Sequence, residues 1–366
     1  MPDKIRIGVI GASLRQGWAQ RSHLPALASH PDFELAAVCT TNTQSAEESR
    51  QKFGARLAFA DHREMLARPD IDAVAVVVKV PSHYQPTLDA IAAGKHVYTE
   101  WPLGRTTDEA LDMAGKANAK GVRHMVGLQA RGNPAILYMK DLVQEGYVGE
   151  MLSCRVQVVR SGILARPSAR SWQREDSRGA NILTIPFGHT IDAFRFVAGD
   201  FASVRALLST QVKQWLETDT KKLVSVDAPD TVMVAGELRN GAVASAHVAT
   251  VPWAGTEFRM EIYGRDGTLM AIAPESPQIG VVRLQGAKGS DELKDLDVPA
   301  RYSRLSSPPR AEARNIAEMY ARFAEAIRSG KRCEPSFDDA LELHRLLDAL
   351  RSSSREKREV QLRSAT

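Results

Sequence analysis

The sequence predicts an α/β fold in which a doubly wound parallel sheet is followed by an α+β domain with a large open antiparallel sheet. Two observations predict it. Short β-branched runs alternate with helical patterns as far as residue 130, and runs with strand-like alternation dominate residues 150–285. We therefore expect one domain over residues 1–129 and a second over residues 130–366, with a C-terminal helix over residues 336–353 that packs back on the first domain.

The first domain is expected to contain six parallel strands separated by helices. The strands are predicted at residues 4–11, 33–41, 55–60, 71–80, 95–101 and 123–129. The fourth run is apolar along nearly its whole length, so it should be buried on both faces of the sheet. Helices are predicted to start after Asp61, Ser82 and Thr106, and Glu109 completes a capping box with Thr106.

The composition is that of an ordinary globular protein. Of 366 residues, 43% are hydrophobic and 25% are charged, and the net charge of +4 is spread along the chain, which argues against a nucleic-acid interface. No apolar run is long enough to span a membrane and no signal peptide precedes the first strand, so we expect a cytoplasmic protein. Cys39, Cys154 and Cys333 are widely spaced, so neither a disulfide framework nor a metal site is expected.

A glycine-rich turn, GASLRQGWA, lies where the first strand becomes the first helix. A Rossmann turn requires glycine at the tight bend and small residues where the backbone meets the pyrophosphate and where the helix packs on the strand. Gly11, Ser13 and Gly17 meet these requirements, and Trp18 follows directly. The loop is longer than the G-x-G-x-x-G pattern, but its position in the first strand–helix unit predicts a Rossmann domain that binds a dinucleotide cofactor.

The end of the second strand bears on the choice between NAD and NADP. NAD enzymes with this fold commonly place an acidic residue here to hold the 2′-hydroxyl of the ribose. This chain has Thr40, Thr41 and Asn42 instead, which would not repel a 2′-phosphate, and Arg15 is a candidate to bind one. We expect NADP or NAD as the cofactor, and the neutral strand end favours NADP.

Several motifs along the chain resemble those of one enzyme family. They are GVIG, HLPAL, VPSHY, AGKHVYTEWPL, GLQARGNPAILYMKDLVQEGYVGE and FGHTIDAF. Together these motifs resemble the Gfo/Idh/MocA family, named after glucose–fructose oxidoreductase and inositol dehydrogenase, and the resemblance extends over nearly the whole chain. The GASLRQGWA, LQARGNP and FGHTID segments are most similar to the branch that contains the fungal galactose-regulon repressor.

The resemblance implies a cofactor and substrate pocket at the end of the fifth strand. Family members end this strand with Glu-Lys-Pro, in which the acid and the proline shape the cofactor pocket and the lysine transfers the proton. This chain has Glu100, Trp101 and Pro102, so the titratable lysine is replaced by an indole that can only donate a hydrogen bond. We expect Glu100 and Pro102 to contact the cofactor and Trp101 to stack on a sugar or nicotinamide ring.

A second motif implies a catalytic histidine. The family pattern is Asp-x-x-x-His, and this chain has Ile185 and His189 at the two positions, with Asp192 one turn later. An imidazole near its ordinary pKa of about 6.5 is a competent acid or base at neutral pH. We expect His189 to move the proton and Asp192 to contact the substrate. Lys79, at the end of the apolar fourth strand, is a second catalytic candidate if apolar neighbours lower its pKa.

Four further residues are candidate binding residues. The resemblance implies that His83 and Gln129 contact the cofactor and that Arg131 contacts the substrate. Trp172 lies in the loop RPSARSWQRED together with Arg170, and this loop is expected to close over a substrate.

The second domain is expected to be rich in antiparallel strands. They are predicted at residues 151–162, 203–212, 230–238, 242–250, 257–264 and 268–273. Arg-Asn-Gly at residues 239–241 is a hairpin signal between two of them. The resemblance implies that one face of this sheet pairs subunits, so we expect a homo-oligomer, either a dimer or a tetramer.

Three functions are consistent with these features. The first is an NAD(P)-dependent oxidoreductase that transfers a hydride to or from a carbinol carbon of a sugar, polyol or sugar acid. The second is a dinucleotide-binding pseudoenzyme that senses a ligand and regulates a partner protein, which would explain the missing lysine and aspartate. The third is a redox-neutral enzyme that uses NAD transiently to cleave glycosides. The retained histidine and cofactor turn favour the first.

Overall fold

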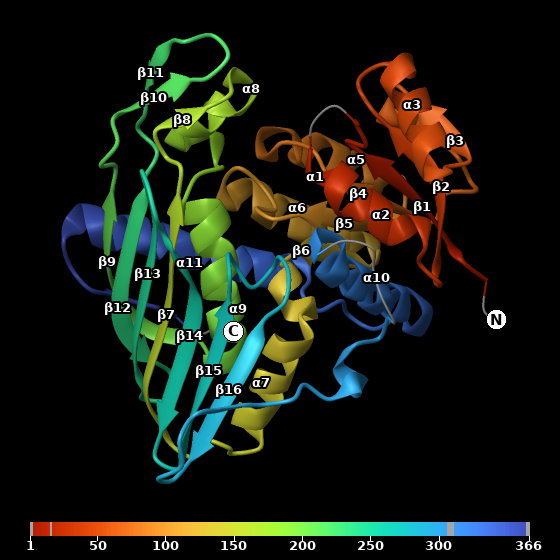
Figure 1. The fold of residues 1–366 in the computed structure, drawn as a ribbon. Coiled ribbons are helices and arrows are strands. Elements are labelled where there is room, and N and C mark those ends of the chain that lie inside the picture. Colours follow the sequence, from red (N-terminus) through yellow and green to blue (C-terminus); the bar gives the residue numbers. More distant parts are fainter. Residues whose placement is uncertain (1–2, 15–16, 306–310, 364–366) are drawn as a thin grey trace. The chain divides into compact units, whose positions relative to one another are not determined.

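The computed structural model describes residues 3–14, 17–305 and 311–363 (Figure 1). The chain divides into two compact units. Unit 1 comprises residues 1–129 and 304–341, and unit 2 comprises residues 130–303 and 342–366. Residues 304–341 therefore group with the N-terminal part of the chain, and the long helix α11 (Phe337–Glu356) begins in unit 1 and ends in unit 2.

Unit 1 contains the predicted six-stranded parallel sheet, with the strand order β3-β2-β1-β4-β5-β6. Its strands are β1 (Ile5–Ile10), β2 (Phe33–Cys39), β3 (Leu57–Phe59), β4 (Ala73–Val76), β5 (His96–Glu100) and β6 (His124–Gly127). The chain first adds β2 and β3 on one side of β1 and then crosses back to add β4, β5 and β6 on the other side. The strand order therefore reverses between β1 and β4. In open α/β sheets, ligands bind beyond the carboxyl ends of the strands at such a reversal.

Helices connect these strands. They are α1 (Trp18–Arg21), α2 (His23–Ala28), α3 (Thr43–Phe53), α4 (His62–Leu66), α5 (Tyr84–Ala92) and α6 (Thr107–Lys120). A further helix of unit 1, α10 (Ala311–Ser329), follows the strand β17 (Lys294–Asp295) of unit 2 in the sequence. The predicted caps Asp61 and Thr106 are confirmed, because each side chain accepts a backbone N–H from the first turn of its helix. Ser82 does not cap α5; it ends a short 3₁₀ helix, Val80–Ser82, and α5 begins after His83.

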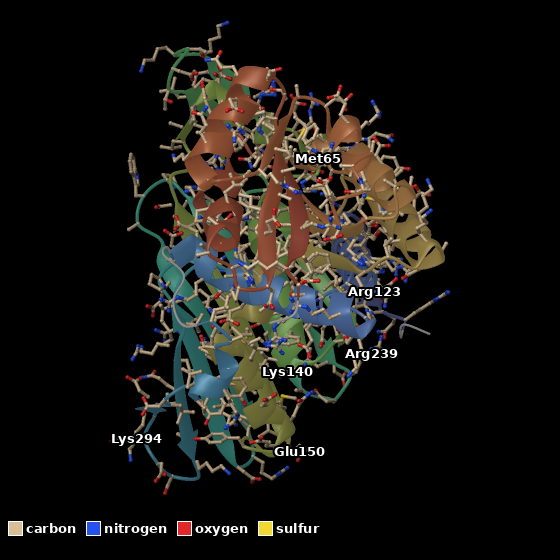
Figure 2. The ribbon with its side chains drawn as sticks, turned by 90° about the vertical axis from the view of Figure 1, so that its right-hand side faces the viewer. Met65, Arg123, Lys140, Glu150, Arg239 and Lys294 are labelled. Carbon is tan, nitrogen blue, oxygen red and sulfur yellow. The ribbon has the colours of Figure 1, made fainter. Side chains whose placement is uncertain are left out.

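The core of unit 1 joins side chains from distant parts of the chain. Phe33 of β2, Tyr98 of β5 and Tyr320 of α10 are fully buried, and the two rings nearest to Tyr320 lie with centroids 5.2 and 5.3 Å from its own. Burial of each such ring contributes about 2 kcal/mol to stability. Gly8 of β1 leaves room for Met65 of α4 (labelled in Figure 2), since a Cβ on Gly8 would lie 2.7 Å from the Met65 sulfur.

Unit 2 is built on a nine-stranded sheet with the order β17-β16-β15-β14-β7-β13-β12-β9-β18 (Figure 1). Its strands are β7 (Met151–Ser161), β9 (Phe201–Ser209), β12 (Thr231–Leu238), β13 (Val243–Val251), β14 (Thr256–Gly264), β15 (Gly267–Ala273), β16 (Arg283–Lys288), β17 (Lys294–Asp295) and β18 (Val360–Gln361). The predicted large sheet is confirmed, with the difference that β7 and β13 run parallel while the other pairs are antiparallel.

The two faces of this sheet differ. Helices α7 (Pro134–Gln144) and α9 (Gly188–Ala198) pack on one face, which buries alternate side chains of the strands. The opposite face carries Leu207, Met233 and Val243, which are 57%, 46% and 59% exposed. Leu207 and Met233 are directly paired across β9 and β12, so they are neighbours on that face.

Several short elements of unit 2 have no counterpart among the predictions. The strands β8 (Ala165–Arg166), β10 (Gln214–Glu217) and β11 (Leu223–Ser225) form a separate three-stranded sheet. The short helices are α8 (Ser168–Ser171), the 3₁₀ helices η2 (Gln129–Gly132), η3 (Trp172–Arg174), η4 (Asp176–Arg178) and η6 (Ala300–Tyr302), and the π-helical turn η5 (Leu183–Phe187). Strands of two to four residues carry too little alternation to be recognised in a sequence.

Cys39, Cys154 and Cys333 are buried and none of them forms a disulfide. Within the ranges that the structure describes, no helix is both long and apolar enough to cross a membrane. The same ranges hold no group of three His, Cys, Asp or Glu side chains arranged to bind a metal ion.

Candidate functional site

The turn after β1 depends on glycine. Gly11 has a φ of +93°, and a Cβ at this position would lie 2.1 Å from the carbonyl oxygen of Val77. Gly17, just before α1, has a φ of +143°. Ser13 and Trp18 lie in the same segment and are half-buried. A turn of bare backbone between a strand and a helix at the sheet's switch point suits the pyrophosphate of a dinucleotide.

The end of β2 is neutral, as predicted. The hydroxyl of Thr40 is buried and donates to the carbonyl of Asn42 at 2.9 Å, and it lies 2.5 Å from the hydroxyl of Ser45. Thr41 is exposed. Thr40 is therefore occupied within the protein, and Thr41 is the hydroxyl that this strand end offers to a ribose. Arg15, the candidate for a 2′-phosphate, lies outside the described residues.

A buried hydrogen-bonded network holds Glu100 at the end of β5. Its carboxylate accepts hydrogen bonds from His23 Nε2 at 2.8 Å and from Gln129 Nε2 at 2.8 and 2.9 Å. The other ring nitrogen of His23 lies 2.7 Å from the hydroxyl of Tyr320. Gly127 leaves room for this network, since a Cβ there would lie 2.5 Å from the Glu100 carboxylate. Glu100 is therefore fixed in one orientation.

His83 joins two loops at the carboxyl edge of the sheet. Its Nδ1 lies 2.8 Å from the carbonyl of Pro102, and its Nε2 lies 3.1 Å from the carbonyl of Val78. Burial lowers the pKa of His83, so the ring is neutral and donates to one of these carbonyls. The Trp101–Pro102 peptide bond is cis. His83 was expected to contact the cofactor; the structure places both its nitrogens on backbone carbonyls, so it positions the loop.

Trp101 and Lys79 differ sharply in burial. Trp101 is only 3% exposed. Lys79 is exposed and lies three residues beyond the end of β4, before the helix Val80–Ser82. The strand β4 ends at Val76, although the apolar run predicted as a strand covers residues 71–80, and Val77 and Val80 remain buried. Lys79 was a catalytic candidate only on the condition that apolar neighbours surround it, and its exposed side chain does not meet that condition.

His189 lies in the first turn of α9, directly after the π-helical turn that contains Ile185 and Pro186. Its Nδ1 is buried and has no hydrogen-bond partner among the described residues. Burial, reinforced by the positive charge of Arg160, lowers the pKa of His189 to about 3. The imidazole is therefore neutral at pH 7, in contrast to the expected pKa near 6.5.

Arg131 and Asp192, both expected at the substrate, are paired with each other. The guanidinium donates to the carboxylate from Nε at 3.0 Å and from Nη2 at 2.6 Å, and the two side chains are 10% and 0% exposed. The guanidinium also lies 5.1 Å from the ring of Phe196, which Lys140 (labelled in Figure 2) approaches to 3.9 Å. This buried bidentate pair fixes α9 to the segment before α7.

Trp172 begins the 3₁₀ helix η3 and is half-buried. Its neighbour Gln173 and the loop residue Arg170 line a cavity of about 300 Å³ in unit 2. The structure thus gives the loop RPSARSWQRED a place on the wall of a cavity, beside the helix that carries His189.

Several residues of these sites were not recognised from the sequence. His23 and Tyr320 complete the network of Glu100, and Arg160 and Arg166 line the cavity of unit 2. A histidine inside the apolar segment HLPAL was the one available signal for His23. Tyr320 lies 297 residues from His23 in the sequence. It belongs to the apolar stripe of an amphipathic helix, so the sequence pattern predicts that its ring is buried but does not predict a hydrogen bond from its hydroxyl.

Comparison with known proteins identifies the family of both parts of the chain. Residues 5–128 match the family model described as "Oxidoreductase family, NAD-binding Rossmann fold" (GFO_IDH_MocA), and residues 134–272 match "Gal80p, C-terminal domain". The chain is 30% identical over 289 residues to "Dehydrogenase aclE" of Aspergillus oryzae. The aligned residues cover 75% of this chain and 78% of that protein. The expected NAD or NADP cofactor is confirmed by the family description.

Two further relatives are named for different functions, one as a dehydrogenase and one as a regulatory protein. Levoglucosan dehydrogenase of Pseudarthrobacter phenanthrenivorans is 26% identical over 96% of both chains, and the structure of a levoglucosan dehydrogenase in complex with NADH has the same fold, with a TM-score of 0.85 at 24% identity over 99% of this chain and 100% of that one. The galactose/lactose metabolism regulatory protein GAL80 of Saccharomyces cerevisiae is 26% identical over 65% of this chain and 59% of that protein. Both parts of the chain match family models, and a dehydrogenase relative is 30% identical to this chain over 78% of the relative's length. The chain therefore belongs to the Gfo/Idh/MocA oxidoreductase family, as its motifs predicted, and to the part of that family that resembles Gal80.

Proposed function

We propose that this protein is an NAD- or NADP-dependent oxidoreductase that transfers a hydride to or from a carbinol carbon of a sugar, polyol or sugar acid. The observation that carries the proposal is His189, a buried neutral imidazole with an unpartnered Nδ1 at the family's catalytic position. A buried polar atom without a partner is costly unless a ligand supplies one. Relatives named levoglucosan dehydrogenase and scyllo-inositol 2-dehydrogenase support a sugar or polyol substrate.

Unit 1 supplies the residues that would hold the cofactor. The bare turn at Gly11 fits a pyrophosphate, Thr41 is the exposed hydroxyl at the ribose position, and Glu100 is a rigid acceptor at the end of β5. When bound, a nicotinamide cofactor supplies the site that accepts or donates the hydride. The indole of Trp101 replaces the family's lysine with a flat apolar wall, so proton transfer is assigned to another residue.

His189 is that residue. In the oxidative direction the carbinol C–H bond breaks with loss of hydride, and the neutral imidazole accepts the hydroxyl proton as the carbonyl forms; in the reductive direction the proton returns. The lowered pKa, about 3, keeps the imidazole of the free protein in the acceptor form throughout the physiological range, and it also makes this imidazole a weak base until a bound substrate gives Nδ1 a partner. We expect kcat/KM for oxidation to be flat between pH 5 and 8, without a step near pH 6.5.

The test is nicotinamide absorbance of the purified protein with NAD or NADP and a panel of sugars, polyols and sugar acids. Substrate-dependent reduction of the cofactor should be lost in His189→Ala and retained in His62→Ala, a control for removal of a surface imidazole paired with Asp89. Tight cofactor binding without any redox change over the panel would contradict the proposal.

A ligand-sensing regulator is the second candidate. Trp101 and Ile185 replace the lysine and aspartate of the family motifs, and residues 134–272 match the Gal80p C-terminal domain. The double substitution Trp101→Lys with Ile185→Asp separates the two functions. If it creates turnover that the wild-type protein lacks, the natural protein is a regulator; if the wild-type protein already turns over, this candidate is excluded.

We also propose that the protein is a homo-oligomer joined through the exposed face of the nine-stranded sheet. Leu207, Met233 and Val243 place apolar surface there, which a second copy would remove from water. Sedimentation equilibrium should show a dimer or tetramer that dissociates in Met233→Glu. The three unpaired cysteines fit a reducing compartment, and we assign the protein to the cytoplasm.

A further inference from the structure

The cavity of about 300 Å³ lies entirely within unit 2. Its wall comprises the end of β7, the loop that continues to η3, the π-helical turn before α9, and the segment around Trp215. Ile185 and Pro186, one turn before His189, are part of this wall. The charge of Arg160, another wall residue, is close enough to His189 to lower the pKa of the imidazole. The cavity therefore lies next to the proposed proton-transfer residue.

Three arginines line this cavity: Arg160, Arg166 and Arg170. Arg166 is half-buried, and its guanidinium lies 4.1 Å from the ring centroid of Trp215. Trp215 is itself 5% exposed and packed in a small apolar cluster, so it forms a rigid platform. Stacking on an indole leaves the edge of a guanidinium, with its N–H groups, free to bind a planar anion bidentately.

No carboxylate forms an ion pair with Arg166 within the described part of the chain. Among the described residues, the guanidinium donates to a neutral group, from Nη1 to the side-chain oxygen of Gln173 at 2.8 Å. Burial together with the charges of Arg170 and Arg160 lowers the pKa of Arg166 to about 10, and no acid acts in the opposite direction. Burying a charge beside like charges is unfavourable unless an anion compensates it.

The acid on the cavity wall is already hydrogen-bonded to other groups. Asp230 also lines the cavity, but its carboxylate accepts the backbone N–H groups of Gln211 and Val212 at 2.7 Å and the hydroxyl of Thr231 at 3.1 Å. Arg160 has a long ion pair with Glu275, at 3.9 Å, whose side chain is 65% exposed. Such a pair at the surface contributes little. The cavity wall thus carries three positive charges and one hydrogen-bonded negative charge.

We infer that this cavity binds the anionic group of the substrate, so that the protein acts on a sugar acid or sugar phosphate in preference to a neutral sugar. The inference rests on the proposed function and deepens it. Arg166, stacked on Trp215, holds the anion bidentately, and Arg160 and Arg170 add charge on either side. An anion fixed beside α9 would bring the carbinol of the same molecule toward His189.

The test is a calorimetric titration with matched ligands, made with and without NAD or NADP. The probes are D-galacturonate and D-glucuronate, the aldonate D-gluconate, and galactose 6-phosphate, each compared with its neutral parent sugar. The variants are Arg166→Gln and Arg170→Gln, and Arg265→Gln is the control, since Arg265 is 66% exposed and paired with Glu150. Arg170 is exposed, so its variant tests the cavity even if Arg166→Gln is poorly folded.

At least one anionic probe should bind tenfold or more tightly than its neutral parent. Arg166→Gln should weaken that binding about tenfold to hundredfold and leave the neutral sugar unaffected, because a hydrogen bond to a charged group is worth about that factor. Arg265→Gln should change neither. A preference for a carboxylate identifies a sugar acid, and a preference for phosphate identifies a sugar phosphate.

Two outcomes would overturn the inference: equal affinity for every anion and its neutral parent, or selective binding that is unchanged in both Arg166→Gln and Arg170→Gln. The assay of hydride transfer separates this result from the proposed function. Charge-selective binding without cofactor reduction would support the cavity and contradict the dehydrogenase. Turnover of neutral sugars at rates unaffected by Arg166→Gln would support the dehydrogenase and contradict the anion-binding cavity.

Discussion

The carboxylate of Glu100 in unit 1 and two basic side chains of unit 2 differ in their partners, although both units contain buried polar atoms without a partner, such as Ser49 Oγ in unit 1. In unit 1 the carboxylate of Glu100 has two donors, His23 and Gln129, and the hydroxyl of Thr40 is bonded within its own turn. In unit 2 the imidazole of His189 has an unpartnered nitrogen and Arg166 has no carboxylate partner among the described residues. A satisfied network holds a preformed shape, whereas an unpaired basic group beside a cavity offers a place where a ligand can supply the partner. Unit 2 is therefore where substrate selectivity should lie.

The largest effect is expected from a paired charge in unit 2. Asp192→Ala removes the carboxylate that pairs bidentately with the buried guanidinium of Arg131, and we expect the free energy of unfolding to fall by about 3–5 kcal/mol in urea titrations. The double variant Arg131→Met with Asp192→Leu should recover most of this loss. In contrast, Arg166→Gln should cost about 1 kcal/mol or less. Equal losses in Asp192→Ala and Arg166→Gln would remove the distinction between paired and unpaired arginines.

The network of unit 1 should rank next. Glu100→Leu removes the acceptor for two buried donors, and we expect the free energy of unfolding to fall by about 2–3 kcal/mol. Glu64→Leu, at an exposed position of α4, serves as the control and should change stability by about 0.5 kcal/mol or less. If the two variants are equally stable, Glu100 is not held as tightly as its contacts indicate.

The pH dependence of stability tests the unsatisfied imidazole of unit 2. The unfolded chain protonates His189 near pH 6.5, but the folded protein does so only near pH 3, so stability falls as the pH decreases below 6.5. At pH 5 the loss from this group is about 2 kcal/mol relative to pH 7. His189→Asn should lose less stability than the wild-type protein over this interval. His124 and His344, with pKa values lowered to about 4 by burial, remain in both proteins and act with the same sign.

The smallest effect concerns the cofactor-binding edge of unit 1. Thr41→Asp adds a carboxylate at the exposed end of β2, where it would repel a 2′-phosphate and accept from a 2′-hydroxyl. We expect the ratio of Kd values to shift toward NAD by about tenfold, or about 1.4 kcal/mol, in fluorescence titrations. Gln51→Glu on α3 is the charge control and should leave the ratio unchanged. An unchanged ratio in Thr41→Asp would place the ribose elsewhere.

Local patterns predicted the sheet of unit 1 well but not where its strands end. The apolar run over residues 71–80 continues beyond Val76, and hydrophobicity alone does not show that hydrogen bonding to the neighbouring strands stops there. Lys79, which the predicted strand included, therefore lies beyond the end of β4 at an exposed position. The parallel pairing of β7 with β13 was missed because antiparallel and parallel strands share the same alternation.

The surroundings of the site residues were even harder to predict from local sequence patterns. Glu100 was predicted at the end of a strand and His189 in a family motif, and they lie at the end of β5 and in the first turn of α9. Their surroundings depend on contacts between residues far apart in the chain, such as His23 with Glu100 and Arg131 with Asp192, which are 77 and 61 residues apart. The pKa of His189 could not be anticipated either, because burial sets it and the sequence does not report burial at a single position.

The discontinuity of unit 1 has a consequence for how this protein can be recombined. Its residues come from two stretches, 1–129 and 304–341, and the second contributes Tyr320, whose hydroxyl meets His23. Suppose that residues 1–129 are replaced by the matching segment of a relative through one junction after residue 129. The relative's sheet would then pack against the α10 of this chain and not against its own. Unit 2 is divided in the same way, into residues 130–303 and 342–366, so exchange of either unit requires three junctions, after residues 129, 303 and 341.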